Sequence, residues 1–122
     1  MPQFTDRELD VMSVLWSLES GVVNEVRDRL ADPLAYNTVL SVLRTLEAKG
    51  YVRHEEEGKA HRYFPTVKRD EAGSSGMWRL VDKVFGGKPE ALLTHLVNDR
   101  RLSRQKLAHM RALLDERLRE AD

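Results

Sequence analysis

The stretch YNTVLSVLRTLEAKGYV, residues 36–52, constrains the fold more than any other part of the chain. At 100° per residue, Val39, Leu43 and Leu46 fall within one narrow arc, which predicts an amphipathic helix. Gly50 stands where the C-terminus of a helix favours glycine, and the aromatic and β-branched residues that follow it predict a strand. The chain therefore combines helices with at least one short strand.

Two shorter helices are predicted before this stretch. Thr5 and Glu8 have the spacing of a capping box, in which a hydroxyl caps the helix and a carboxylate follows three residues later. The first helix opens there, carries apolar residues at helical spacing and ends at Gly21. The second, over residues 22–30, is closed by Asp32-Pro33, because the residue before a proline is pushed out of the helical region.

A hairpin is predicted directly after the third helix. Residues 51–54 and 60–64 have strand character, the turn between them covers residues 55–59, and Pro65 ends the second strand. Three helices followed by a hairpin is the order of a winged helix-turn-helix. We therefore expect a mainly α fold with a small β-hairpin, whose winged helix-turn-helix DNA-binding domain covers residues 1–67.

The remaining residues predict a hinge and a second domain. The sequence KRDEAGSSG, residues 68–76, is polar and rich in glycine and serine, which indicates a hinge. Apolar helical stripes over residues 77–122, punctuated by Gly86-Gly87, Pro89 and Ser103, predict a helical dimerisation domain. Fewer than fifty residues bury too little surface alone, so we expect a homodimer with a two-fold axis. The expected interface residues are Trp78, Val81, Phe85, Leu92, Leu96, Leu107, Met110 and Leu114.

The face of the third helix opposite its apolar arc carries short polar side chains and one arginine. The major groove of DNA admits a helix, whose N-terminal residues meet base edges, and the helix N-terminus attracts phosphate. Asn37 can pair with adenine, Thr38 can contact a phosphate or a thymine methyl, and Arg44 can reach guanine or phosphate. A face selected only for solubility favours Glu and Lys instead. We therefore expect this face to bind DNA through Asn37, Thr38, Ser41, Arg44 and Thr45, with Lys59 of the hairpin turn on the sugar-phosphate backbone.

The charge distribution supports an alternative. The formal net charge is zero, and residues 1–65 carry eight lysines and arginines against eleven acidic residues. Most DNA-binding domains present a basic surface, and the run Glu55-Glu56-Glu57 in the hairpin repels phosphate. The alternative function is a winged-helix module that binds another protein and has no sequence-specific DNA binding.

The chain resembles the penicillinase-repressor family of winged-helix transcriptional regulators, which includes beta-lactamase, methicillin-resistance and copper-responsive repressors. The matching segments are ELDVMSVLW, AYNTVLSVLRTLEAKGYV and GKAHRYFP. The resemblance implies a dimeric repressor that binds a short inverted repeat in double-stranded DNA. It places Tyr36, Asn37, Thr38 and Ser41 in the groove and Lys59 at the wing tip. The family often has a basic residue immediately before Leu46, whereas this chain has Thr45 there and Arg44 one place earlier.

The resemblance also suggests how repression ends. In the beta-lactam branch, a membrane sensor with a cytoplasmic metalloprotease leads to cleavage of the repressor at an Asn-Phe bond in the dimerisation region. The aligned pair here is His95-Leu96, a different dipeptide that is the candidate cleavage point. The copper branch binds metal through paired cysteines, and this chain has no cysteine. Two routes stay open, namely proteolysis near His95-Leu96 and binding of a small ligand between the hinge and the dimerisation domain.

No catalytic arrangement is found in the sequence. The absence of cysteine excludes disulfides, thiolate catalysis and thiolate metal sites. His54 and His61 can face each other across the hairpin, but a metal site there needs further ligands. Neither a nucleophile elbow nor a glycine-rich phosphate loop is present. We expect no enzymatic activity, cofactor or metal and, without a signal peptide or an apolar run long enough to enter a membrane, a cytoplasmic protein.

Overall fold

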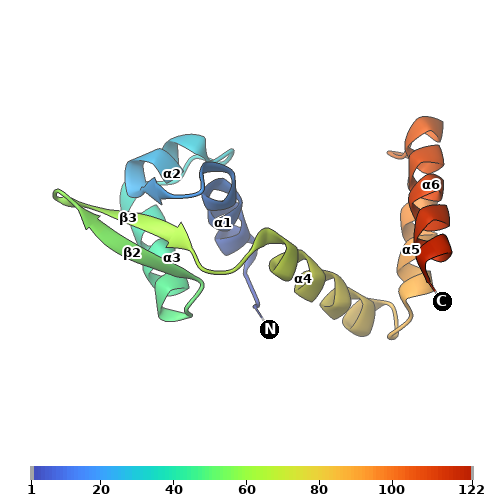
Figure 1. Ribbon diagram of the computed structural model, residues 1–122. Helices are drawn as coiled ribbons and strands as arrows, with labels where there is room; N and C mark the ends of the chain where they lie inside the picture. The colour runs from blue at the N-terminus through green and yellow to red at the C-terminus, as the bar shows by residue number, and fades with distance from the viewer. Residues whose placement is uncertain (1, 122) are drawn as a thin grey trace. The chain divides into compact units, whose positions relative to one another are not determined.

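The computed structural model describes residues 2–121. These residues form two compact units, which divide between Met77 and Trp78. The elements of the first unit are α1 (Asp6–Leu18), β1 (Gly21–Val22), α2 (Val23–Arg29), α3 (Tyr36–Ala48), β2 (Val52–Glu57) and β3 (Ala60–Pro65). The strands form one antiparallel sheet in the order β1-β3-β2. The β2–β3 hairpin projects away from the three helices as a wing (Figure 1). The expected winged helix-turn-helix is confirmed.

The core of this unit is built from one face of each helix and the inner face of the sheet. The apolar arc predicted for α3 is buried, with Val39, Leu43 and Leu46 fully covered. It packs in one cluster with residues of α1, α2 and the sheet, namely Val11, Met12, Leu15, Val23, Val26, Val52 and Tyr63. Burial of this arc leaves the polar face of α3 on the surface.

The first helix begins as predicted and ends earlier than predicted. The hydroxyl of Thr5 accepts a hydrogen bond from the backbone N–H of Glu8 at 3.2 Å, and Glu8 Oε1 accepts one from the N–H of Thr5 at 2.8 Å. The helix stops at Leu18 and not at Gly21, and its C-cap residue Glu19, with φ of 71°, adopts a left-handed conformation. Gly21 instead enters β1, where an added Cβ would lie only 3.2 Å from the side chain of Val26.

The hairpin is longer and its turn tighter than the sequence predicted. Pairing continues to Glu57 and Ala60, so that the turn is the dipeptide Gly58-Lys59 and not the five residues 55–59. Gly58 has φ of 62°, a left-handed conformation in which glycine avoids the strain of a side chain. The sequence also did not predict β1, because a strand of two residues is too short to show periodicity.

The expected hinge is not a loop. Residues 69–76 form the first half of α4 (Arg69–Val84), which continues into the second unit. Asp70 and Glu71 lie in its first turn, where carboxylates offset the positive end of the helix dipole. Ala72 and Ser75 are buried, and the Ser75 hydroxyl donates to the carbonyl of Pro2 at 3.0 Å. These contacts stabilise helix in a segment whose composition suggested flexibility.

The second unit contains the end of α4, α5 (Pro89–Val97) and α6 (Arg104–Glu120). Their boundaries follow the predicted signals. Gly86 and Gly87 both have positive φ after α4, and Pro89 is the first residue of α5. The hydroxyl of Ser103 accepts from the N–H of Lys106 at 3.1 Å and caps α6. Within residues 2–121 we find no helix with the length and apolarity needed to cross a membrane.

Candidate nucleic-acid interface

The polar face of α3 is accessible along the helix. Asn37, Ser41, Arg44 and Thr45 are exposed, and Thr38 is half-buried. The predicted residue Tyr36, at the first position of the helix, is 42% exposed. The structure thus brings six of the seven predicted DNA-contact residues onto one helix.

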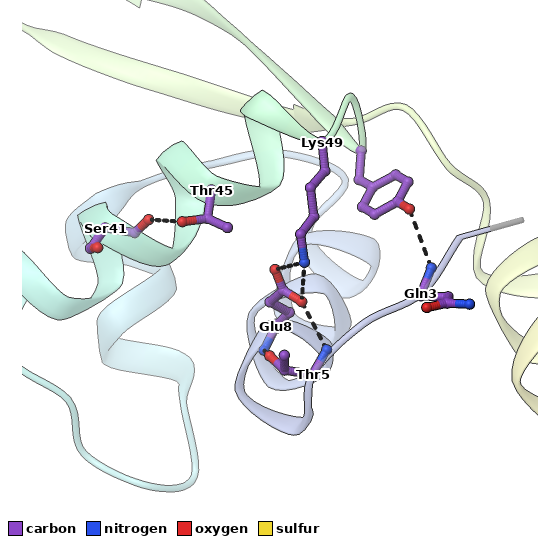
Figure 2. A network of polar contacts seen from close by, with 7 residues as sticks. Gln3, Thr5, Glu8, Ser41, Thr45 and Lys49 are labelled. Carbon is purple, nitrogen blue, oxygen red and sulfur yellow. Dashed lines mark hydrogen bonds and ion pairs between the residues drawn. The ribbon is translucent and has the colours of Figure 1, made fainter.

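Ser41 and Thr45 lie one turn apart on this face and are joined by a hydrogen bond. The Thr45 hydroxyl donates to the Ser41 carbonyl at 3.0 Å, as Figure 2 shows. With its hydrogen committed to the helix, Thr45 presents a methyl group and an acceptor oxygen to the surroundings. Both side chains are short, so an approaching groove can come close to the α3 backbone.

The N-terminus of α3 has no side-chain cap. Its N-cap residue is Ala35, and no acidic residue lies in its first turn. By contrast, α1 has Asp6 and Glu8 in its first turn, and α2 has Glu25. The first N–H groups of a helix have no partner within it, and the dipole adds partial positive charge there. The start of α3 is therefore suited to an external anion such as phosphate.

Two of the three carboxylates in the Glu55–Glu57 run, those of Glu55 and Glu57, form ion pairs with arginines on the same sheet face. Arg53 Nη1 lies 2.9 Å from Glu55 Oε1, and Arg62 binds both carboxylate oxygens of Glu57 at 3.1 and 3.0 Å. These hydrogen bonds from Arg62 lower the pKa of Glu57. Arg62 also reaches Glu25, which itself caps α2, at 3.2 Å. The repulsion of phosphate that we predicted from the carboxylate run is therefore reduced.

Two predicted contact residues keep their positive charge unpaired. Neither Arg44 nor Lys59 forms an ion pair within residues 2–121, whereas Arg53 and Arg62 each do. Lys59 is exposed in the two-residue turn at the wing tip. Arg44 on the polar face of α3 and Lys59 at the wing tip are therefore the cations best placed to contact phosphate.

His54 and His61 stack where the wing meets α3. Their rings are 4.3 Å apart and inclined by 11°, and His54 Nδ1 lies 2.5 Å from Glu47 Oε2 on α3. Tyr63 is buried beside them, and this burial raises the pKa of its phenol. No cluster of three candidate metal ligands occurs among the described residues. The contact of His54 with Glu47 joins the wing to the last turn of α3, and His61 stacks on His54.

The residues predicted for the dimer interface differ in exposure within the single chain. Trp78, Leu96 and Leu114 are 43%, 45% and 48% exposed, which is high for large apolar side chains. Phe85, Leu92, Leu107 and Met110 are half-buried. Val81 is only 1% exposed, so its own chain already covers it and little of it is left for a partner. The candidate cleavage pair, His95 and Leu96, is exposed within helix α5, where the His95 ring lies 5.6 Å from that of Phe85.

Sequence reasoning missed the long-range polar contacts of this region. The capping box pointed to Glu8, but its partner Lys49 lies 41 residues further along the chain. Arg62 likewise joins Glu57 and Glu25, which lie on different elements. Successive side chains of a strand point to opposite faces, which places Glu57 and Arg62 on the same face of the hairpin. This alternation was the only feature of the sequence that could have predicted their ion pair.

Comparison with known proteins extends over nearly the whole sequence. Residues 4–116 match the family described as penicillinase repressor. The penicillinase repressor of Bacillus licheniformis is 25% identical over 118 residues, which cover 95% of this chain and 92% of that protein. The transcriptional regulator BlaI of Mycobacterium tuberculosis is 38% identical over 96 residues, which cover 75% of this chain and 70% of that protein.

Solved structures show the same likeness. The solution structure of the DNA-binding domain of the repressor BlaI has 33% sequence identity and a TM-score of 0.52, covering 57% of this chain and 88% of that one. The Bacillus licheniformis BlaI monomeric form in complex with the blaP half-operator gives 33% identity and a TM-score of 0.50, with the same coverage.

Proposed function

Because the chain belongs to the penicillinase repressor family, we propose that it is a transcriptional repressor that binds a short inverted-repeat operator as a homodimer. The observation that carries this proposal is the exposed polar face of α3 with its uncapped N-terminus. The related BlaI in complex with a half-operator supports double-stranded DNA as the ligand.

In this proposal α3 enters the major groove, and its exposed residues read base edges. Asn37 pairs with adenine, and Arg44 contacts guanine or a phosphate. Thr45 stands where the family often has a basic residue. Because its hydroxyl already donates to the Ser41 carbonyl, Thr45 offers a base mainly its methyl group, which suits the methyl of thymine. The operator should therefore differ at this position from those of relatives with a basic residue.

The wing contributes affinity and little sequence preference. Lys59 at the turn meets the sugar-phosphate backbone as a flexible point charge. The pairing of Arg53 with Glu55 and of Arg62 with Glu57 keeps the rest of this sheet face near neutral. Affinity from the wing should accordingly depend on salt and hardly on base sequence.

Dimerisation through residues 78–122 completes the proposed repressor. Apolar side chains of α4, α5 and α6 remain exposed in the single chain, and a second copy would cover them. A two-fold dimer places its recognition helices on half-sites about 34 Å, one DNA turn, apart. Loss of dimerisation would uncouple the half-sites and lower the effective concentration of the second α3.

Derepression follows one of two routes. Cleavage at His95-Leu96, by a protease linked to a membrane sensor, would remove α6 from the chain. Because this pair lies inside helix α5, a protease would need α5 to unwind locally first. The other route is a small ligand that binds beside α4. Intact-mass measurement of repressor from induced and uninduced cells separates the two, since a single full-length species in both excludes proteolysis.

Selection from a random duplex pool with the purified, full-length protein tests the DNA-binding function. We expect enrichment of an inverted repeat with fixed spacing. Thr38→Ala and Arg44→Ala should weaken binding to that repeat, whereas Arg119→Ala, an exposed arginine in the last turn of α6, serves as the control. If a folded, dimeric protein enriches no sequence, the chain is instead a module that binds another protein.

A further inference from the structure

An ion pair between a buried carboxylate and a partly exposed lysine joins the start of α1 to the end of α3. The Glu8 side chain is only 5% exposed, and its two carboxylate oxygens lie 3.0 and 2.8 Å from Lys49 Nζ. Lys49 is the C-cap residue of α3, so this contact holds the end of the helix opposite to the one that leads into the proposed groove. Figure 2 shows the pair between the two helices.

Glu8 is held in its charged form in this position. Burial alone raises the pKa of the Glu8 carboxyl, but the hydrogen bonds from Lys49 and from the N–H of Thr5 outweigh it, and the pKa lies below its usual value. A buried carboxylate that stays ionised needs its cation nearby. Lys49 can therefore move away from Glu8 only at a cost, and the end of α3 is held with it.

This polar contact adds a constraint that the core does not supply. The buried apolar residues of α1 and α3 pack without directional preference, whereas the two Lys49–Glu8 hydrogen bonds fix distance and direction. The aromatic corner beside them supports the same end of the helix. Tyr51 follows α3, its hydroxyl accepts from the N–H of Gln3 at 3.2 Å, and its ring lies 4.8 Å from that of Phe4.

A continuous chain of contacts leads from Glu8 to the proposed base-reading residues. The backbone N–H of Lys49 donates to the carbonyl of Thr45 at 3.0 Å, and the Thr45 hydroxyl donates to the carbonyl of Ser41 at 3.0 Å. At 1.5 Å per residue, Asn37 lies about 18 Å along the helix from Lys49, so a tilt of about 3° at Lys49 moves Asn37 by about 1 Å. Precise polar recognition tolerates a displacement of about 0.5 Å.

We propose that Glu8 and Lys49 are positioning residues that set the sequence specificity of α3 without contacting DNA bases. The inference rests on the proposed function of α3 as the recognition helix. Base contacts have strict geometry, whereas phosphate contacts through long flexible side chains tolerate small shifts. Loosening the ion pair therefore lowers affinity for the operator more than affinity for unrelated DNA.

The test uses two variants that break the pair from opposite sides. Glu8→Gln removes the charge and keeps the capping box, because glutamine serves equally at that position. Lys49→Met removes the cation and keeps the aliphatic stem, and Lys49→Arg restores the charge. Fluorescence anisotropy at fixed salt measures the affinity of each full-length protein for the selected operator and for a scrambled duplex of equal length. Circular dichroism shows that each variant is folded at the assay temperature.

We expect the ratio of operator to scrambled affinity to fall about tenfold in Glu8→Gln and in Lys49→Met, similar to the loss for one mismatched base pair. Lys49→Arg should recover most of the ratio. Equal losses on both duplexes in Lys49→Met, with no loss in Glu8→Gln, would mean that Lys49 binds phosphate directly and would overturn the inference. An unchanged ratio in both folded variants would also overturn it. If the wild-type protein does not distinguish the operator from the scrambled duplex, the proposed function itself fails. If the wild-type protein and both variants distinguish the two duplexes equally well, only the positioning role fails.

Discussion

Replacement of Glu8 by glutamine should destabilise the first unit in a manner that depends on pH. Removal of one partner from a fully buried ion pair typically costs about 3–5 kcal/mol, because the other charge is left without compensation. Here the Lys49 side chain is 40% exposed and regains water when Glu8 is neutral, which reduces the penalty. The capping box survives in the variant. We therefore expect a loss of about 1–2 kcal/mol at pH 7, near the lower end for hydrogen bonds to charged groups.

The pH dependence of this stability loss follows from the direction in which the pKa of Glu8 is shifted. The pKa of Glu8 lies below its usual value in the folded protein, so ionised Glu8 stabilises the fold at pH values above that usual value. This contribution disappears as the pH falls through the lowered pKa. Protonated Glu8 then resembles glutamine, and the difference in the free energy of unfolding between wild type and Glu8→Gln should approach zero in acid.

Urea unfolding, followed by circular dichroism at several pH values, measures this difference. At pH 7 the melting temperature should also fall by about 5–10 °C, the shift expected for a unit of this size. Glu55→Gln is the matched control, because it breaks an exposed pair in which the Arg53 and Glu55 side chains are 54% and 62% exposed, and it should change stability little. A difference that persists unchanged in acid would show that shape, and not ionisation, explains the loss. No difference at pH 7 would refute the reasoning.

Three further predictions concern the core and the DNA-facing residues. Leu43 is fully buried, so Leu43→Ala should lower the free energy of unfolding, measured by denaturant titration, by about 2–5 kcal/mol. A loss below about 1 kcal/mol would contradict its place in the core. Lys59→Ala should weaken binding to the operator and to the scrambled duplex alike. Because one phosphate contact is lost, the slope of log affinity against log salt should become shallower by about 0.9. A loss of affinity confined to the operator would show that Lys59 reads bases. Thr45→Arg should steepen that slope by about 0.9 and, in a repeated duplex selection, shift the preferred base pair toward guanine; an identical selected sequence would place Thr45 outside the groove.

The elements that were predicted correctly depend on interactions between residues close in the chain. The Thr5–Glu8 capping box joins residues three positions apart, and the buried arc of α3 arises from the spacing of apolar residues in successive turns of one helix. The polar face of α3 was visible for the same reason, because the apolar arc determines which side chains remain outside. Recognition of the family extended this prediction to Tyr36.

The segment predicted to be a hinge, residues 68–76, is mostly helical in the structure. Its polar, glycine- and serine-rich composition predicted a hinge, and each glycine in a helix costs about 1 kcal/mol relative to alanine. In the structure Ala72 and Ser75 are buried, and the Ser75 hydroxyl bonds to the carbonyl of Pro2, 73 residues earlier in the chain. Tertiary contacts of this kind outweigh helix propensity, which is a weak preference.

By itself, then, the sequence determined the order of the helices and of the hairpin, the buried and exposed faces of α3, and the helix boundaries at Pro89 and Ser103. Only the tertiary structure decided which charges are neutralised. It paired Glu8 with Lys49 and Glu57 with Arg62, and it left Arg44 and Lys59 without ion pairs among the described residues. The physical reason is range: helix and strand patterns arise from neighbours along the chain, whereas ion pairing depends on which distant segments the folded core brings within about 4 Å.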